Sequence, residues 1–292
     1  MNEFELIDAI IDVLGPAAEG GLIGPGDDCA VVAVPPGQLL VSSIDTLVSG
    51  VHFPADAAGE LVGYRALMVT LSDLAAMGAE PAEVLVALTL EETDQRWALA
   101  VAAGMREAIA DTGGSILGGN LARGPRSVTL SVHGFCAEPD LLRRNGAKPG
   151  DGIFVTGALG AAAAAVALDR LDDPSDPLTV RYFRPRARVD AGRVLRGRAS
   201  AAIDLSDGLL QDLDHVCQAS GVGAELDPAA IPVAAGAELE HALGGGDDYE
   251  LLFTAREKPE GVEAWRIGTV SADSGIRLDG EPAAIKGYVH FL

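Results

Sequence analysis

Aspartate residues beside glycine, or at the ends of apolar runs, are the side chains in this sequence best suited to do chemistry. They occur in five short segments with the composition of turns and strand ends. A scaffold positions loop carboxylates of this kind and leaves them accessible to a ligand. A single Asp–Gly pair often marks an ordinary turn, whereas five segments in one acidic chain favour a shared site. The residues are Asp27 and Asp28, Asp45, Asp73, Asp204 and Asp207, and Asp247 and Asp248.

Carboxylates that converge cannot all stay ionised without cations, and their hard oxygen atoms select Mg²⁺, Mn²⁺ or Ca²⁺. Mg²⁺ binds through one or two carboxylates together with substrate phosphates, so an acidic cleft of this kind can hold a polyphosphate. The sequence has neither a P-loop nor a kinase-type glycine-rich loop. Backbone N–H groups of Gly118, Gly119 and Asn120 offer another way to hold phosphate.

Composition excludes several other classes of protein. The 292 residues include 21 Lys and Arg against 43 Asp and Glu, a net charge of −22, which argues against nucleic-acid binding. The 36 glycines and 48% apolar residues favour a folded α/β enzyme. Three widely spaced cysteines predict neither a disulfide framework nor a zinc site. With no signal-peptide pattern and no apolar run long enough to span a membrane, we expect a cytoplasmic protein.

Helix and strand patterns alternate along the chain and restart after a loop-rich stretch near 138–150. They predict an α/β (α+β) fold in two domains, residues 1–138 and 139–292. We expect a mixed sheet with helices in the first domain and an α/β sandwich in the second. The predicted helices are 4–14, 60–77, 94–112, 158–171, 187–198 and 208–219. The predicted strands are 29–34, 39–45, 84–90, 128–135, 153–157, 201–204, 223–226, 250–254, 265–270 and 288–291, with 115–117 running into the glycine turn at 118–120.

Together the motifs resemble those of the thiamine-monophosphate kinase family, whose superfamily also contains aminoimidazole ribonucleotide synthetase and selenophosphate synthetase. They stand in family order and cover nearly the whole chain, and the GDD, LSDLAAMGA and DLSDGL segments are the most specific. The segments are GPGDDCAVV (24–32), SSIDTLVSGVHF (42–53), LSDLAAMGAEP (71–81), ILGGN with ARGP (116–125), RNGAKPGD (144–151), AIDLSDGLLQDL (202–213), GGDDYELLFT (245–254) and KGYVHF (286–291).

The resemblance implies transfer of the γ-phosphoryl group of ATP to thiamine monophosphate, with several Mg²⁺ ions and a homodimer formed through the N-terminal halves. It implies metal ligands at Asp27, Asp28, Ser43, the Ile44 carbonyl, Asp45, Asp73, Asn120, Asp204 and Asp207. Nucleotide contacts are implied at Gly119, Asn120, Arg144 and Ser206, and contacts with the thiamine substrate at His52, Asp247 and Tyr288.

The chemistry agrees with these roles, because the acceptor is a phosphate monoester with a second pKa near ~6 that needs no general base at neutral pH. The obstacle is repulsion between two anions, which metal ions screen, so we expect no side-chain nucleophile. Arg144 would clamp phosphate through its guanidinium. Each of three residues also has an alternative interpretation: Arg144 as a solvated loop residue, His52 as a core histidine and Tyr288 as a packed aromatic side chain. The seven arginines of 181–198 form a solvated face or contact phosphate.

Two positions depart from the family pattern. Asn120 stands where the family usually has Asp, which removes one negative charge from a metal site, and Asp247 stands where many relatives have Glu. The substitution at 120 leaves open a catalytically silent paralogue that binds nucleotide or metal. Another ATP-dependent reaction of the superfamily, on a different substrate, is the second alternative.

Overall fold

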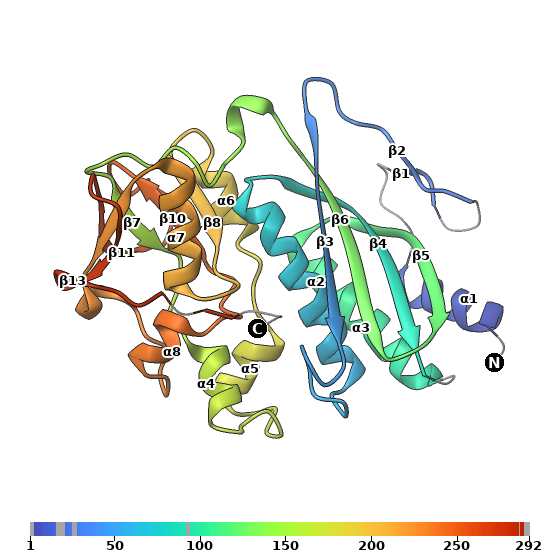
Figure 1. Ribbon diagram of the computed structural model, residues 1–292. Helices are drawn as coiled ribbons and strands as arrows, with labels where there is room; N and C mark the ends of the chain where they lie inside the picture. Colours follow the sequence, from blue (N-terminus) through green and yellow to red (C-terminus); the bar gives the residue numbers. More distant parts are fainter. Residues whose placement is uncertain (1–2, 16–20, 25–27, 92–93, 286, 289–292) are drawn as a thin grey trace. The chain divides into compact units, whose positions relative to one another are not determined.

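The computed structural model describes residues 3–15, 21–24, 28–91, 94–285 and 287–288 (Figure 1). The chain divides into two compact units, Met1–Leu74 with Glu80–Glu138 and Ala75–Ala79 with Pro139–Leu292. Each unit is built around one larger sheet with helices, so the expected mixed α/β class is confirmed. Among the described residues, no helix is both long and apolar enough to cross a membrane.

The first unit contains a four-stranded sheet with the order β3-β6-β4-β5. The pairs β3–β6 and β6–β4 are antiparallel, and β4–β5 is parallel. Figure 1 shows α2 and α3 on one side of this sheet, with α1 beside α3. The bounds are β3 Leu39–Val48, β4 Glu80–Leu90, β5 Ser115–Arg123, β6 Ser127–Cys136, α1 Glu3–Leu14, α2 Gly59–Ala76 and α3 Gln95–Thr112.

Alternation along β6 separates the two faces of this sheet. Val128, Leu130 and Val132 are fully buried, whereas Thr129 and Ser131 between them are half-buried. Successive side chains of a strand point to opposite faces, so one face packs under the helices and the other, called the open face here, does not. Register extends the open face across the sheet, through Ile44, Ser131 and Leu85 in one row and Thr46, Thr129, Ala87 and Asn120 in the next.

A short hairpin of β1 (Gly21–Ile23) and β2 (Val31–Val32) precedes β3. The predicted strand at 29–34 is therefore only two residues long. Gly21 and Ile23 of the segment before it pair with Val32 and Val31 and form the other strand of the hairpin.

The second unit contains a seven-stranded sheet with the order β13-β12-β9-β11-β7-β10-β8. Only β12 and β9 pair in parallel among its described strands. The bounds are β7 Gly152–Val155, β8 Ala201–Asp204, β9 Gly223–Leu226, β10 Leu251–Ala255, β11 Trp265–Ser271, β12 Gly275–Leu278 and β13 Glu281–Pro282.

Both faces of this second sheet are buried. Ile153 and Val155 of β7 belong to one apolar cluster with residues of α7, whereas Phe154 belongs to another with residues of α6. Strands β7, β8 and β10 are buried at every position, and their residues are mainly apolar, as is typical of strands covered on both faces. The helices are α4 Ala161–Ala167, α5 Pro177–Phe183, α6 Val189–Leu195, α7 Leu209–Ser220 and α8 Leu239–Gly244, with 3₁₀ turns at Glu138–Asp140 and Pro228–Ala230.

Several elements differ from the sequence prediction. The helix expected over 158–171 ends at Ala167, and Asp169 just after it has a left-handed φ of 51°, which ends a helix. Helices α5 and α8 and strands β12 and β13 were not predicted. The strand expected at 288–291 lies outside the described residues except for Tyr288, which is in no strand.

Candidate active site

In the first unit, three predicted metal ligands lie together on the helix-covered face. Ser43 and Asp45 alternate along β3 opposite the buried Val132 and Leu130. The Ser43 hydroxyl donates a hydrogen bond to Oδ2 of Asp73, which lies on α2. Helix α2 therefore delivers one carboxylate to the strand that carries the other.

These two carboxylates repel each other. Burial raises the pKa of Asp45 to about 6, the charge of Asp73 raises it further in the same direction, and a hydrogen bond with Thr70 opposes the shift. A divalent cation between such carboxylates would remove the repulsion, and the donor set of two carboxylates and a hydroxyl is one that Mg²⁺ accepts. The residues present therefore fit the metal site that the family resemblance implies.

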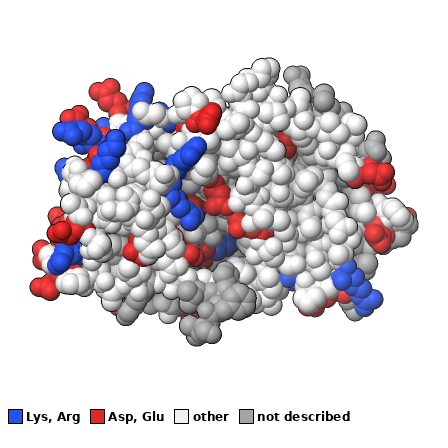
Figure 2. Space-filling model, turned by 45° about the horizontal axis from the view of Figure 1, so that its top comes forward, with Lys and Arg blue, Asp and Glu red and all other residues white. Residues whose placement is uncertain are grey.

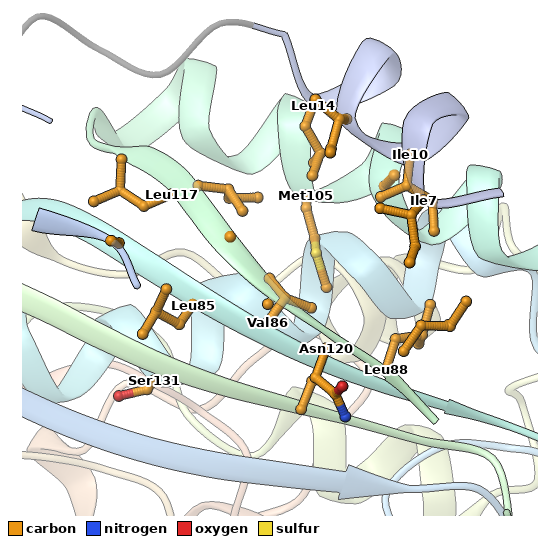
Figure 3. A pocket seen from close by; sticks show the side chains of 18 of the residues that line it. Ile7, Ile10, Leu14, Leu85, Val86, Leu88, Met105, Leu117, Asn120 and Ser131 are labelled. Carbon is orange, nitrogen blue, oxygen red and sulfur yellow. The ribbon is translucent and has the colours of Figure 1, made fainter. Parts of the chain in front are cut away.

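A cavity of about 650 Å³ lies in the first unit between α1, α3 and β5. Four predicted site residues line it, namely Asp28, Ile44, Gly119 and Asn120. Its remaining lining is mainly apolar, and Figure 3 shows Leu14, Ile10 and Ile7 of α1 together with Met105 of α3 around the same space as Asn120 and Ser131. The cavity thus joins predicted metal and nucleotide positions to an apolar chamber.

Asn120 is not in the same cluster as Asp45 and Asp73. It shares the open face with Thr129 and Ala87, whereas Asp45 lies on the covered face. Strands β6 and β4 also separate β3 from β5, which corresponds to roughly 14 Å across three strand spacings. Within the first unit, the predicted metal ligands therefore form two groups.

Gly119 has a packing role beside its predicted contact with nucleotide. A Cβ added there would lie 1.8 Å from the Val86 carbonyl oxygen of the paired strand β4. Any side chain at this position would push β5 away from β4. The predicted glycine turn at 118–120 is consequently part of strand β5.

In the second unit, the turn after β8 lies against the segment that precedes β10. The backbone N–H of Asp247 donates to the Ser206 carbonyl (2.9 Å), and that of Tyr249 donates to the Leu205 carbonyl (2.8 Å). A Cβ on Gly246 would lie 2.3 Å from the Ser206 carbonyl oxygen, so only glycine allows this approach. These contacts hold Asp204, Ser206, Asp207 and Asp247 in one region.

The C-terminal segment reaches the same region. The backbone N–H of Tyr288 donates to the Asp207 carbonyl (3.1 Å), while Nε2 of Gln211 donates to Oδ2 of Asp207 (3.1 Å) and to the Tyr288 carbonyl (3.2 Å). The Tyr288 side chain is 47% exposed, which suits contact with a ligand. The structure therefore brings together the predicted residues Asp207, Asp247 and Tyr288 within one unit.

Asp212 and His215 lie close to Asp207 at this turn, and neither was predicted as a site residue. Ligand atoms of Asp207, Asp212 and His215 all lie within 4.8 Å of one another. Burial raises the pKa of Asp212 to about 7, although its Oδ2 accepts hydrogen bonds from the backbone N–H groups of Asp207 and Gly208 (both 3.1 Å). The helical spacing from Asp207 to Gln211, and from Gly208 to Asp212, was the signal available in the sequence.

The segment that carries Asp247 has an unusual backbone. Asp247 and Tyr249 both have left-handed φ values, 68° and 52°, a conformation that costs free energy for residues with side chains. The Tyr249 hydroxyl donates to Oδ1 of Asp247 (2.8 Å). The surrounding structure must therefore hold this loop in place.

Buried acidic residues on either side of Tyr249 supply that support. Glu250 is 1% exposed and accepts hydrogen bonds from the Thr156 hydroxyl (2.7 Å) and from the guanidinium groups of Arg181 (2.9 Å) and Arg188. Oδ1 of Asp248 accepts from the Gly160 N–H (2.8 Å), and burial raises the pKa of Asp248 well above its usual value. Two of the seven clustered arginines thus share this buried carboxylate as their structural partner.

The remaining predicted residues lie elsewhere. His52 is half-buried in the turn after β3, where its Nδ1 accepts from the Val48 N–H (3.1 Å). Arg144 is exposed, and its carbonyl accepts from Ser220 at the C-terminal end of α7 (3.3 Å), so its backbone lies at the opposite end of α7 from Ser206. Asp28 is exposed, and Asp27 lies outside the described residues.

Comparison with known proteins places these residues in context. Residues 26–137 match the family model described as AIR synthase related protein, N-terminal domain, and residues 148–281 match its C-terminal domain. Curated thiamine-monophosphate kinases from Salmonella typhimurium and Escherichia coli are 42% and 41% identical to this chain, covering 99% of it and 98% of each relative.

Solved structures give the same result. A thiamine-monophosphate kinase from Stenotrophomonas maltophilia aligns with a TM-score of 0.89 at 36% identity, over 97% of this chain and 98% of that one. A structure described as AaThiL complexed with AMPPCP and TMP aligns with a TM-score of 0.82 at 30% identity, over 99% of this chain and 97% of that one.

Replacing Asp45 with Asn tests the repulsion between Asp45 and Asp73. Because the folded-state pKa of about 6 lies above the usual value of 3.8, ionisation of Asp45 destabilises the fold above that pH and not below pH 4. Without Mg²⁺, we expect Asp45→Asn to raise the free energy of unfolding at pH 8 by on the order of 2 kcal/mol, with the gain disappearing by pH 4. Urea denaturation at both pH values measures this, with the exposed Asp56→Asn as control. A gain that did not depend on pH would contradict the assignment.

Replacing Glu250 with Gln tests the support of the Asp247 segment. The change leaves Arg181 and Arg188 without their buried counter-charge, which we expect to cost about 3 kcal/mol of stability. The matched variant Asp248→Asn replaces a carboxyl that has no arginine hydrogen-bonded to it among the described contacts and whose pKa is raised by burial, and we expect a loss below about 1 kcal/mol. Urea denaturation at pH 7.5 compares the two, and equal losses would show that the arginine pairing is not the support.

Proposed function

The chain belongs to the AIR synthase related proteins and, among them, to the thiamine-monophosphate kinase family, and from this premise we propose that it transfers the γ-phosphoryl group of ATP directly to thiamine monophosphate, with Mg²⁺ as the metal. The products are ADP and thiamine diphosphate. Near-complete coverage of kinases at 42% identity is the observation that carries the proposal. The proposal includes a cytoplasmic location, which the use of ATP supports.

The proposed reaction needs positioning more than acid–base chemistry. The acceptor phosphate is a nucleophile at neutral pH, and the barrier comes from bringing two anions together in line. When bound, Mg²⁺ supplies charge that screens this repulsion. Asp28, Ser43, Asp45 and Asp73 in the first unit, with Asp204 and Asp207 in the second, are the residues proposed to hold it.

Nucleotide and acceptor are proposed to use different parts of the chain. Gly119 and Asn120 line the cavity of the first unit, and with Ser206 and Arg144 they are proposed to contact ATP. Asp247 and Tyr288, which converge on Asp207, are proposed with His52 to contact thiamine monophosphate. The strained backbone at Asp247 supports this role, since strain of this kind concentrates at ligand sites.

A homodimer is proposed through the open face of the first unit's sheet. Leu40 and Ile44 of β3 are 52% and 65% exposed, and Leu85 of β4 is 38% exposed. Figure 2 shows few charged side chains over the central part of this unit. A second copy of the same face would bury these apolar side chains, and apolar patches of this kind mark interaction sites.

Direct measurement of thiamine diphosphate tests the proposed reaction. With purified protein, ATP and thiamine monophosphate, we expect product that depends on Mg²⁺. Asn120→Asp restores the family's carboxylate, so we expect half-maximal rate at a severalfold lower Mg²⁺ concentration. The exposed substitution Gln38→Glu is the control for added charge. Absence of product from the wild-type chain at saturating Mg²⁺ would overturn the proposed function.

Light scattering coupled to gel filtration tests the dimer. We expect the wild-type chain to elute with twice its 29.9 kDa mass, and Leu40→Asp to elute as a monomer because it places a charge in the interface. Leu168→Asp changes a leucine of similar exposure in the second unit and should leave the dimer intact. A monomeric wild-type chain, or loss of the dimer in both variants alike, would contradict the proposal.

A further inference from the structure

The segment between β3 and α2 carries His52, and residues 49–58 are called the His52 loop here. Its first turn is closed from both sides: the His52 N–H donates to the Val48 carbonyl (2.9 Å), and the Val48 N–H donates to Nδ1 of His52 (3.1 Å). Because Nδ1 accepts a hydrogen bond, the proton of the neutral ring is on Nε2. The ring is therefore a donor at Nε2, the kind of group that a ligand oxygen accepts from.

Trp97, in the first turn of α3, fixes the rest of the loop. Its Nε1 donates to the Ala57 carbonyl (3.1 Å), and its ring stacks on that of Phe53 with the centroids 6.3 Å apart. Trp97 is 8% exposed and Phe53 is 2% exposed. Since Phe53 follows His52 directly, this aromatic pair determines where the chain runs immediately after the histidine.

Arg126, in the turn between β5 and β6, contacts the same loop at two points. Its Nη1 donates to the Ala55 carbonyl (2.8 Å), and its own carbonyl accepts from the Ser49 N–H (3.1 Å). The guanidinium also lies over the Trp97 ring, with Cζ 4.5 Å from the centroid, which is a favourable contact between a cation and an aromatic face. The arginine and the tryptophan therefore act on the loop together.

Asp94 orients this arginine. Its Oδ1 accepts from the Trp97 N–H (3.2 Å) and caps α3, while its Oδ2 accepts from Nη2 of Arg126 (3.3 Å). The donors of a guanidinium are fixed in one plane, so Arg126 can meet Asp94 and Ala55 at once while it lies against the indole. A lysine ammonium cannot make all three contacts.

These contacts suit a loop whose position matters for ligand binding. They reach the carbonyl groups of an irregular segment, and a misplacement of about 1 Å in a substrate-positioning group can cost on the order of 100-fold in rate. Trp97, Arg126 and Asp94 lie outside all the sequence segments that carry the family resemblance. Their residue types alone therefore gave no sign of a role at the site.

We propose that Trp97 and Arg126 are positioning residues for the acceptor substrate. They fix the His52 loop so that the Nε2–H of His52 meets thiamine monophosphate. The inference rests on the proposed function, in which His52 contacts this substrate, and it adds the residues that place the histidine. Neither residue touches substrate itself.

Steady-state kinetics of Arg126→Met tests this role. The variant loses the hydrogen bonds to Ala55 and Asp94, and we expect KM for thiamine monophosphate to rise about fivefold while kcat and KM for ATP stay within about twofold. Arg126→Lys keeps the charge and should give a smaller rise. The control Arg106→Met changes an exposed arginine of α3 and should alter neither KM. An unchanged KM for thiamine monophosphate, or an equal rise in both KM values, would overturn the inference.

Combining Arg126→Met with His52→Ala separates positioning from a general loss of stability. His52→Ala alone should raise KM for thiamine monophosphate, and adding Arg126→Met should raise it no further, because the second change acts through the histidine. Additive effects would overturn the positioning role. If the wild-type chain is active and the Arg126 variants match it, that role alone fails. A wild-type chain that forms no thiamine diphosphate at saturating Mg²⁺ would instead overturn the proposed function.

Hydrogen–deuterium exchange gives a readout that needs no turnover. Without ligand, Arg126→Met and Arg126→Lys should speed exchange severalfold in residues 48–58 and leave residues 128–132 of β6 unchanged, because only the loop loses its contacts. Thiamine monophosphate should slow exchange in residues 48–58 of the wild-type chain, and less so in the variants. Arg126→Lys decides the test where Arg126→Met does not fold. Exchange as slow as in the wild type, or equally faster exchange in β6, would overturn the inference.

Discussion

Carboxylates held close together and partly out of water are the constraint on which the rest of this structure depends. Burial and the charge of Asp73 both raise the pKa of Asp45, so the folded chain contains repulsion that does not help it fold. Local hydrogen bonds offset part of that cost, as the Ser43 hydroxyl does for Asp73 and the Gly208 N–H does for Asp212. Repulsion retained in this way is useful only where cations and phosphates bind.

The second unit meets the same constraint by fixing its backbone. The turn after β8 and the Asp247 segment are joined by main-chain hydrogen bonds, and the absence of a Cβ at Gly246 allows their approach. The pairing of Glu250 with Arg181 and Arg188 then anchors the end of that segment. The main chain and the buried ion pairs thus set the positions of Asp207, Asp247 and Tyr288, which are among the residues proposed to contact ligands.

Sequence patterns predicted the long elements of this fold and the kinds of residue in its site, but not how the residues group. Helices α2 and α3 were predicted within two residues at each end, because a long apolar periodicity outweighs local context. Helices α5 and α8 are short and depend on tertiary packing, so periodicity did not reveal them. Asn120 was predicted as a metal-site residue, and strand register, which no single-sequence pattern gives, places it on the opposite face of the sheet from Asp45. Gln211 was missed because its role depends on the C-terminal segment returning to α7.

An acidic chain that binds a nucleotide must obtain affinity from something other than attraction between its own charges and the phosphates. The apolar lining of the cavity in the first unit offers another source of affinity, because contact between aliphatic side chains and an apolar part of a ligand does not depend on charge. Contact of that kind is the same before and after phosphoryl transfer, so it strengthens binding without changing the barrier. The carboxylates act where charge moves between two phosphates. Substitutions among them can therefore change the metal site without loss of nucleotide affinity. A single substitution such as Asn120 in the metal region is therefore compatible with a chain that still binds its nucleotide.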